Sequence, residues 1–235
     1  MKFGLVGYGK WGKILEKSLL DFGDLVFISN TKKTYKINKM IDFCFVATDD
    51  HNHYKVVKYF LKKKIPVFCE KPLCRNISQS KELILLSKKL KTPLFIDHVE
   101  MFKKKSFIVK KINIIERKKK TNDNIKDVLW KLCYHDLYLL YNYINTKKII
   151  VKLLNKTKTQ IKFKIINKNK DYIFMYDLNY PKRIHRINQT SFISKKNYLK
   201  KMISDVIRHK VNYIKNNKQA IFCIKTIIKI NNKIF

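Results

Sequence analysis

Three glycines near the start of the chain, Gly7, Gly9 and Gly12, have the spacing GxGxxG within the stretch VGYGKWGK. The stretch follows an apolar run and opens a segment with helical spacing, which is the context of a dinucleotide-binding turn. The first glycine allows the turn, the second lets the backbone approach a pyrophosphate, and the third lets the helix pack close to the strand. We therefore predict a dinucleotide site here. Its other residues are Tyr8, Lys10 and Trp11.

The second apolar run ends in polar residues that bear on the choice of cofactor. NAD sites usually show Asp or Glu at this point, where it binds the ribose hydroxyls. This chain has Ser29 and Asn30, followed by Thr31, Lys32 and Lys33. Small polar residues followed by lysines suit a 2′-phosphate. The pattern leaves NAD and NADP both open and favours NADP slightly.

The stretch FCEKPLC places Glu70, Lys71 and Pro72 directly after an apolar run. One interpretation is a polar turn in which proline ends the strand pairing. The other is a lysine at the carboxyl end of a parallel sheet, where α/β proteins bind their ligands. The remaining motifs decide between the two.

Metal binding is not indicated by the histidines and cysteines. His51 and His53 are two residues apart and do not share a helix face, and no third ligand is evident. No CxxC pair occurs among the five cysteines, whose count is odd. Those within apolar runs, Cys44 and Cys69, are expected to be buried free thiols in a reducing compartment. Without a secretory segment or a long apolar run, we expect a cytoplasmic protein.

The elements that must position these residues alternate between strand and helix over the first hundred residues. Such alternation predicts right-handed βαβ units and a doubly wound parallel sheet of the Rossmann type. The expected strands are 3–9, 25–29, 41–48, 65–71 and 92–98, and the expected helices are 11–23, 53–64 and 78–91. Gly23 is expected to end the first helix, and Ser78 is expected to cap the third. Only about ten residues, NTKKTYKINK, lie between the second and third strands, so the crossover helix is expected to be missing or reduced to a turn.

The pattern changes after about residue 98. We expect a long helix over 122–144, then consecutive strands with short polar links, which favour an antiparallel sheet. The expected strands are 149–156, 159–166, 172–178 and 183–189, and the expected closing helices are 197–214 and 219–230, the last of which could also be a strand. The prediction is a dinucleotide-binding domain over 1–98 and an α+β domain with a mostly antiparallel open sheet over 99–235.

The charge of the chain is strongly positive. Lys and Arg total 53 against 17 Asp and Glu, a net charge of +36. Such a surface attracts polyanions, so a basic polyanion-binding protein is one alternative function. The lysines are spread along the whole chain, however, and no basic stripe with interleaved aromatic residues stands out. We interpret the charge as a general bias in composition, with no specific nucleic-acid or membrane partner.

Taken in order, VGYGKWG, VATDDHNHY and FCEKPLC resemble the Gfo/Idh/MocA oxidoreductases, relatives of glucose–fructose oxidoreductase and inositol dehydrogenase. The family's ATPxxxH element is matched by Thr48 and His53, with Asp49 where proline is usual. Its EKP element is matched by residues 70–72. The later DVLWKLCYHDLYLL resembles the family's LWDxGxHDL helix, and NYPKRIHRI resembles a strand of members that act on sugars.

The resemblance implies roles for individual residues. Lys71 would lie near the substrate hydroxyl and the nicotinamide, Glu70 would brace it, and Pro72 would be a cis proline. Thr48 and His53 would belong to the cofactor site. His135 would act as general acid or base on the carbinol. The substrate would contact Lys71, Lys131 and His135.

Lys131 departs from the family, which usually has an Asp four residues before the histidine. On an α-helix the two positions share a face. An acid there would support a cationic His135, whereas a lysine disfavours it. Three hypotheses follow: a lowered pKa that makes Lys71 a better base, an anionic substrate, or lost catalysis.

The resemblance implies an NAD(P)-dependent oxidoreductase that moves a hydride between the nicotinamide and a carbinol of a sugar, cyclitol or nucleotide-sugar. The open sheet would pack against a second subunit, giving a homodimer or homotetramer. A catalytically degenerate dinucleotide-binding protein of the same fold is the first alternative, and the polyanion-binding protein is the second.

Overall fold

The computed structural model of the chain describes residues 1–30, 40–103, 105–194 and 196–235. These residues form two units. The first unit contains residues 1–99 and 197–224, and the second contains 100–196 and 225–235. The boundary expected from the sequence, between residues 98 and 99, lies one residue from the boundary between residues 99 and 100 in the structure. The C-terminal segment 197–224, however, belongs to the first unit.

A parallel sheet of five strands forms the centre of the first unit, in the order β2-β1-β3-β4-β5. The strands are β1 Lys2–Val6, β2 Asp24–Ser29, β3 Phe43–Val46, β4 Val67–Cys69 and β5 Leu94–Ile96. Strands β3, β4 and β5 are buried at every position. Their continuous apolar runs are typical of a sheet that is covered on both faces. The predicted Rossmann-type sheet is confirmed.

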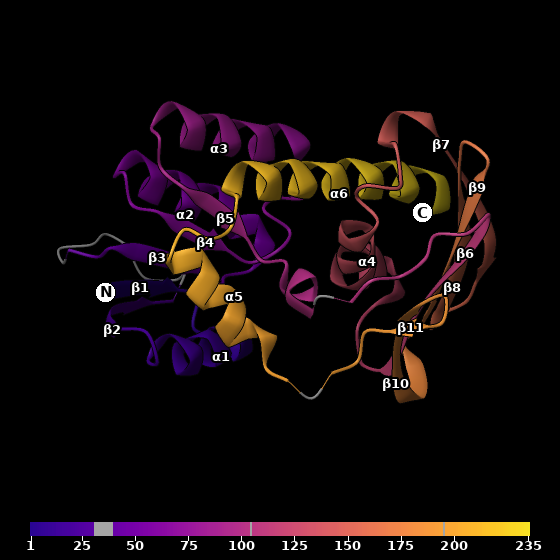
Figure 1. Ribbon diagram of the computed structural model, residues 1–235, viewed down its shortest axis with the longest axis horizontal. Helices are drawn as coiled ribbons and strands as arrows, with labels where there is room; N and C mark the ends of the chain where they lie inside the picture. Colours follow the sequence, from indigo (N-terminus) through magenta and orange to yellow (C-terminus); the bar gives the residue numbers. More distant parts are fainter. Residues whose placement is uncertain (31–39, 104, 195) are drawn as a thin grey trace. The chain divides into compact units, whose positions relative to one another are not determined.

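The helices of this unit cover both faces of the sheet because the strand order reverses at β1. Right-handed crossovers to β2 and to β4 run in opposite directions, so their helices lie on opposite faces. Figure 1 shows α2 and α3 on one face and α1 and α5 on the other. The helices are α1 Lys10–Leu19, α2 Asp50–Lys62, α3 Ile77–Lys89 and α5 Tyr198–Ile207.

Two predicted helix ends are wrong. The first helix ends at Leu19 rather than at Gly23, where an added Cβ would lie 2.1 Å from the Met1 carbonyl oxygen. The third helix is capped by Asn76, whose Oδ1 accepts hydrogen bonds from the backbone nitrogens of Ser78 at 2.8 Å and Gln79 at 3.1 Å. Asn and Ser are both good N-cap residues, so residue type alone did not distinguish them.

The open edge of β5 is paired by a side chain. Asn216 accepts a hydrogen bond from the Ile96 nitrogen at 2.8 Å and donates one to the Ile96 oxygen at 2.9 Å. Asn216 lies on α6, Tyr213–Ile234, which is a helix throughout. The predicted helix 197–214 divides into α5 and the start of α6, because the chain turns at His209 with a φ of 54°.

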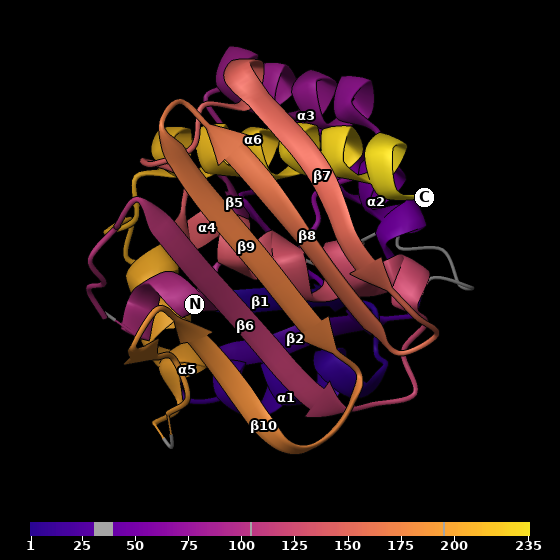
Figure 2. The same cartoon turned by 90° about the vertical axis from the view of Figure 1, so that its right-hand side faces the viewer.

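The second unit contains a six-stranded sheet in the order β11-β10-β6-β9-β8-β7. Only β6 and β9 pair in parallel, which confirms the mostly antiparallel sheet. Figure 2 shows one face of the sheet with no described helix over it. The strands are β6 Ile112–Lys120, β7 Ile149–Lys156, β8 Gln160–Asn167, β9 Lys170–Asp177, β10 Asn179–Ile187 and β11 Thr190–Ser191.

The segment 122–144 does not form the long helix that was predicted. It begins with a 3-10 turn, η2 Ile125–Asp127, continues as a π-helix, η3 Leu129–Cys133, and ends as α4 Tyr134–Leu139. A further 3-10 turn, η4, covers Thr146–Lys148, and η1 covers Val99–Lys103. The π-helix matters for the site because it lies directly before His135.

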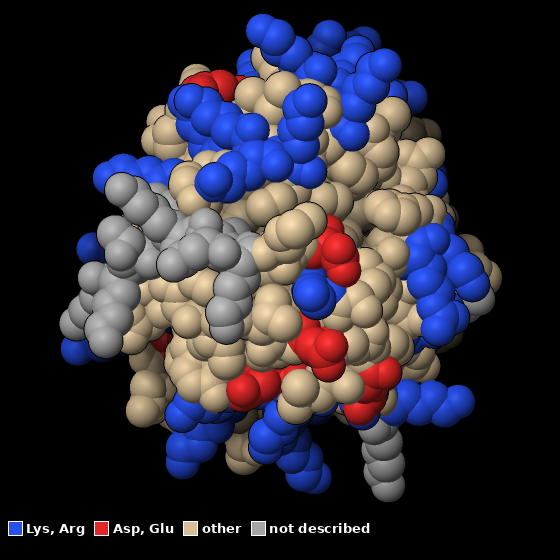
Figure 3. All heavy atoms as spheres, turned by 90° about the vertical axis from the view of Figure 1, so that its left-hand side faces the viewer, with Lys and Arg blue, Asp and Glu red and all other residues tan. Residues whose placement is uncertain are grey.

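The charge has no further test in the structure, so its interpretation as a distributed bias stays a prediction. On the face shown in Figure 3, Lys and Arg side chains form several separate groups, and most of the Asp and Glu side chains lie near the centre and the lower edge. Within the described residues, no helix is long and apolar enough to cross a membrane.

Candidate functional site

The glycine turn after β1 has one glycine that faces open space. Gly7 has a φ of +101°, and a Cβ there would lie 2.4 Å from the Ala47 carbonyl carbon. A Cβ on Gly12 would lie 2.1 Å from the Gly7 oxygen. A Cβ on Gly9 would meet no atom of the described residues within 4 Å. Packing within the protein therefore requires the first and third glycines, while the space beside the second is large enough for a ligand to approach the backbone.

The N-terminus of α1 lies directly after this space. Gly9 is its N-cap residue, no side chain caps it, and its first turn holds no acid. Uncapped backbone N–H groups and the helix dipole favour an anion at such an end. Lys10 is exposed and Trp11 is half-buried. The Tyr8 hydroxyl donates to Glu16 at 2.7 Å, and this bond raises the pKa of Tyr8.

The end of β2 joins the same turn through the backbone. The Gly7 nitrogen donates to the Ser29 oxygen at 2.7 Å. Ser29 is buried and its Oγ bonds to the Asn30 oxygen at 3.0 Å, while Asn30 is exposed. The shortened crossover and residues 31–33, on which the NADP preference depends, lie outside the described residues.

His53 joins two loops of the predicted site. It is buried, with Nδ1 at 2.8 Å from the Pro72 oxygen and Nε2 at 3.0 Å from the Thr48 oxygen. Burial lowers its pKa despite these bonds. The Thr48 hydroxyl donates to the Asp49 oxygen at 3.1 Å. His53 therefore supports the loop after β3 and the loop after β4, and its ring nitrogens face protein atoms.

The EKP loop follows β4 at the carboxyl end of the sheet. The Lys71–Pro72 peptide is cis, as predicted. Lys71 is half-buried, and its backbone nitrogen donates to Glu70 Oε2 at 3.1 Å. Burial raises the pKa of Glu70 well above its usual range, and the neighbouring carboxylate of Asp97 raises it further. The structure thus adds Asp97, which the sequence analysis did not select.

His98 follows Asp97 after β5. It is buried, and burial together with the charge of Lys71 lowers its pKa well below the usual range. His98 is therefore neutral near pH 7. Lys71, Glu70, Asp97 and His98 all belong to the first unit and lie at the carboxyl ends of β4 and β5.

His135 and Lys131 belong to the second unit. His135 is half-buried on α4, and Lys131 is exposed on the π-helix before it. The Lys131 ammonium donates to Asp123 Oδ1 at 2.6 Å. Burial alone would raise the pKa of Asp123, but bonds from Lys131, Thr121 and Lys119 lower it to about 2. The lysine that replaces the family's acid therefore has a local counter-charge.

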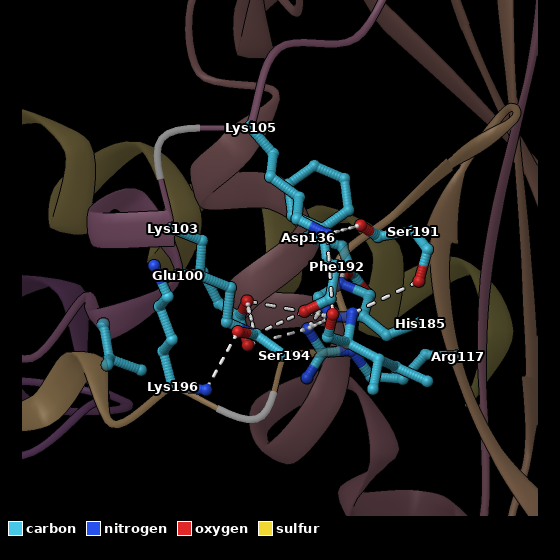
Figure 4. Close-up of polar contacts among 12 residues, drawn as sticks. Glu100, Lys103, Lys105, Arg117, Asp136, His185, Ser191, Phe192, Ser194 and Lys196 are labelled. Carbon is cyan, nitrogen blue, oxygen red and sulfur yellow. Dashed lines mark hydrogen bonds and ion pairs between the residues drawn. The ribbon is translucent and has the colours of Figure 1, made fainter.

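Asp136, next to His135, is the centre of a buried polar cluster, drawn in Figure 4. Its Oδ1 accepts from Arg117 at 3.2 Å and from His185 Nε2 at 2.9 Å. Its Oδ2 accepts from the Tyr176 hydroxyl at 2.9 Å. Burial would raise the pKa of Asp136, but Arg117 and these bonds keep it below the usual range.

The cluster continues to Glu100, which forms an ion pair with Lys103 at 2.6 Å and approaches Arg117 to 3.6 Å. Burial and the charge of Arg117 lower the pKa of His185, so its ring is neutral near pH 7. A neutral ring that donates from Nε2 to Asp136 can accept the Arg117 bond at Nδ1, at 3.1 Å. The cluster fixes α4, and with it the backbone of His135.

Metal ligation receives no support from the described residues, in which no group of three or more His, Cys, Asp and Glu side chains could hold an ion. The five cysteines are buried free thiols.

The first unit has a Rossmann-type fold with a glycine turn after its first strand. Residues 25–98 match the model of an oxidoreductase family with an NAD-binding Rossmann fold, Gfo/Idh/MocA. This match agrees with the resemblance seen in VATDDHNHY and FCEKPLC, and the matched range contains most of β2, all of β3–β5 and the EKP loop. A search of curated proteins found no match.

Solved structures share the fold over nearly the whole chain. UDP-N-acetylglucosamine 3-dehydrogenase from Acidithiobacillus ferrooxidans has a TM-score of 0.82 at 13% identity, with 99% of this chain and 97% of that chain covered. The WlbA dehydrogenase from Thermus thermophilus, in complex with NAD and UDP-GlcNAcA, has a TM-score of 0.75 at 11% identity, with 97% and 94% covered.

Proposed function

We propose that the chain is an NAD(P)-dependent oxidoreductase that moves a hydride between the nicotinamide and a CH–OH carbon of a sugar, cyclitol or nucleotide-sugar. The observation that carries the proposal is the open space beside Gly9, at the N-terminus of α1 and in the same unit as the EKP loop. The family match and the named activities of the similar structures support it.

The chain's residues would divide the binding of the dinucleotide between them. The backbone of Gly7–Gly12 and the first turn of α1 would hold the pyrophosphate. Ser29 and Asn30 would lie toward the ribose, since they end the neighbouring strand. Thr48 and Glu70 would border the nicotinamide end, supported by His53, which bonds the backbone on both sides.

The nicotinamide, when bound, would supply the hydride acceptor. Lys71 and His135 would handle the proton of the substrate hydroxyl, and Lys71 would also bind the substrate. His135 is suited to this role because Asp136 keeps its helix fixed from the buried side. Lys71→Ala is expected to lower turnover at least about a hundredfold, because general acid–base catalysis contributes about 10²–10⁴-fold.

The named substrates of the similar structures favour a nucleotide-sugar. The test is the appearance of reduced nucleotide in mixtures of the chain, NAD or NADP, and one of a panel of sugars, cyclitols and nucleotide-sugars. Turnover of a panel member that disappears in Lys71→Ala supports the proposal. Cofactor binding without turnover of any member supports the alternative, a degenerate dinucleotide-binding protein.

Substitution of Lys131 distinguishes a catalytically active site from a degenerate one. Lys131→Asp restores the family's acid, but it places a second negative charge next to Asp123, which Lys131 contacts at 2.6 Å. The double variant Lys131→Asp/Asp123→Asn avoids this repulsion. Hydride transfer that occurs only in the double variant indicates a degenerate native site. Lower transfer in the double variant indicates that the lysine serves the native reaction, for example with an anionic substrate.

A further inference from the structure

Glu70 and Asp97 occupy equivalent positions on neighbouring strands. Each is the first residue after its strand, β4 or β5, and the two strands pair in parallel with Cys69 opposite Ile96. The Asp97 nitrogen donates to the Cys69 oxygen at 2.9 Å, so the pairing continues one step further. The topology therefore brings two carboxyl groups together beside Lys71.

The hydrogen bonds of the two carboxyl groups leave one place for a proton. Glu70 Oε2 accepts from the Lys71 nitrogen at 3.1 Å, and Asp97 Oδ1 accepts from the Val99 nitrogen at 2.9 Å. Glu70 Oε1 is buried, and no N–H or O–H group among the described residues donates to it. The neighbouring Asp97 carboxyl group lies close enough to Glu70 to raise the pKa of Glu70. Two carboxylates both accept, so a hydrogen bond between the two groups needs a proton on one of them.

The surroundings favour Glu70 as the carboxyl that holds this proton. Burial raises the pKa of Glu70 most, the charge of Asp97 and the bond with it raise it further, and Lys71 only partly opposes them. The other titratable groups at the pair are uncharged near pH 7. Burial raises the pKa of the Cys69 thiol, and burial lowers the pKa of His98. The charges that remain at the pair are then the ammonium of Lys71 and one negative charge shared by the two carboxyl groups.

We propose that Glu70 and Asp97 share one proton and act as a singly charged pair, with Asp97 as a positioning residue for Lys71. As far as it concerns catalysis, the proposal rests on the proposed function. It gives Lys71 one negative neighbour rather than the two that separately ionised Glu70 and Asp97 would supply. Glu70 then braces the Lys71 backbone through Oε2, and Asp97 carries the charge that favours the ammonium.

The proton can be detected without activity. A protonated carboxyl group has an infrared carbonyl band that a carboxylate lacks. At pH 7 the wild-type protein is expected to show such a band, and Glu70→Gln is expected to lose it. Glu82→Gln is the control, because Glu82 is exposed and forms an ion pair with Lys58 at 2.6 Å. The control is expected to keep the band.

The second variant, Asp97→Asn, covers the case in which Glu70→Gln does not fold. It replaces the charged acceptor of the proton by a neutral one, so the band is expected to remain and to change its frequency. Absence of the band from the wild-type protein overturns the proposal, and so does a band that neither Glu70→Gln nor Asp97→Asn alters.

The pH dependence of turnover tests the role of the charge. Turnover is expected to rise with pH as Lys71 loses its proton. Loss of a negative neighbour disfavours the Lys71 ammonium, so in Asp97→Asn this rise is expected to shift to lower pH by about 1 unit or more. Glu70→Gln replaces one neutral group by another, so the rise of turnover with pH is expected to stay at the same pH. Equal shifts in the two variants overturn the single-charge pair. If no substrate is turned over, the proposed function fails, and the infrared band still decides whether the pair holds a proton.

Discussion

Substitution by alanine is expected to have different effects on stability at Gly9 and at Gly12. A methyl group on Gly9 meets no atom within 4 Å in the part of the chain that the structure describes, whereas one on Gly12 would lie 2.1 Å from the Gly7 oxygen. Gly9→Ala is expected to lower the free energy of unfolding by about 1 kcal/mol at most, which is the cost of Ala as a poorer N-cap than Gly. It is expected to weaken dinucleotide binding at least about tenfold, or about 1.4 kcal/mol.

Calorimetric titration and thermal unfolding of both variants measure these effects. Gly12→Ala is expected to lower the melting temperature strongly, which makes it the control for a glycine that packing requires. Unchanged nucleotide affinity in a folded Gly9→Ala protein would contradict the ligand site.

Substitution of Asp136 and of Asp123 compares how much a buried carboxylate and a surface carboxylate contribute to stability. Asp136→Asn leaves the buried Arg117 without its closest counter-charge, so it is expected to cost about 3–5 kcal/mol of stability. Asp123→Asn breaks partly exposed pairs with Lys119 and Lys131 and is expected to cost about 0–1 kcal/mol. Denaturant unfolding compares the two, and equal losses would refute the assigned role of the buried cluster.

The sequence was sufficient to select the glycine turn and the cis Pro72, because each belongs to a short local motif, while the role of Lys71 stays a prediction. It did not reveal Asp97, Arg117 or His185. Asp136 lies 19 residues from Arg117 and 49 from His185 along the chain, and no local spacing indicates such contacts. NYPKRIHRI was selected as a strand, but only the fold shows that its histidine faces Asp136.

At the scale of elements, the cap of α3 gives a direct test. Asn76→Ala removes the acceptor for the Ser78 and Gln79 nitrogens and is expected to cost about 1 kcal/mol. Ser78→Ala changes an exposed residue of the first turn and is the matched control. Chemical denaturation measures both. A larger loss for Ser78→Ala would show that the helix begins at the residue predicted from the sequence.

The strands were easier to predict than the helices. Every predicted strand is present, because buried parallel strands and alternating antiparallel strands both leave clear apolar patterns. Strand β6 was missed because it ends in the run ERKKK, which resembles a polar loop. The segment 122–144 was predicted as one helix because its apolar spacing is nearly continuous, and that spacing does not distinguish π-helical from α-helical turns.

At the scale of the whole molecule, the predicted homo-oligomer would use the face of the second sheet that no described helix covers (Figure 2). Ile114 and Ile173 lie side by side there, on β6 and β9, and Ile114 is exposed. Ile114→Lys is expected to convert a dimer or tetramer to smaller species in sedimentation velocity. Leu85→Lys, on the exposed surface of α3, is the control. A mass that Ile114→Lys leaves unchanged would contradict an interface on this face.

The central claim is that the chain binds a nicotinamide dinucleotide at the glycine turn. The most direct measurement is a fluorescence titration of the purified protein with NADH and, separately, with NADPH. We expect saturable binding of at least one of them, with one site per chain. The affinity is expected to depend on salt only as weakly as the few phosphate charges of one dinucleotide require. Failure to bind either nucleotide, or binding as steeply salt-dependent as that of a general polyanion site, would contradict it.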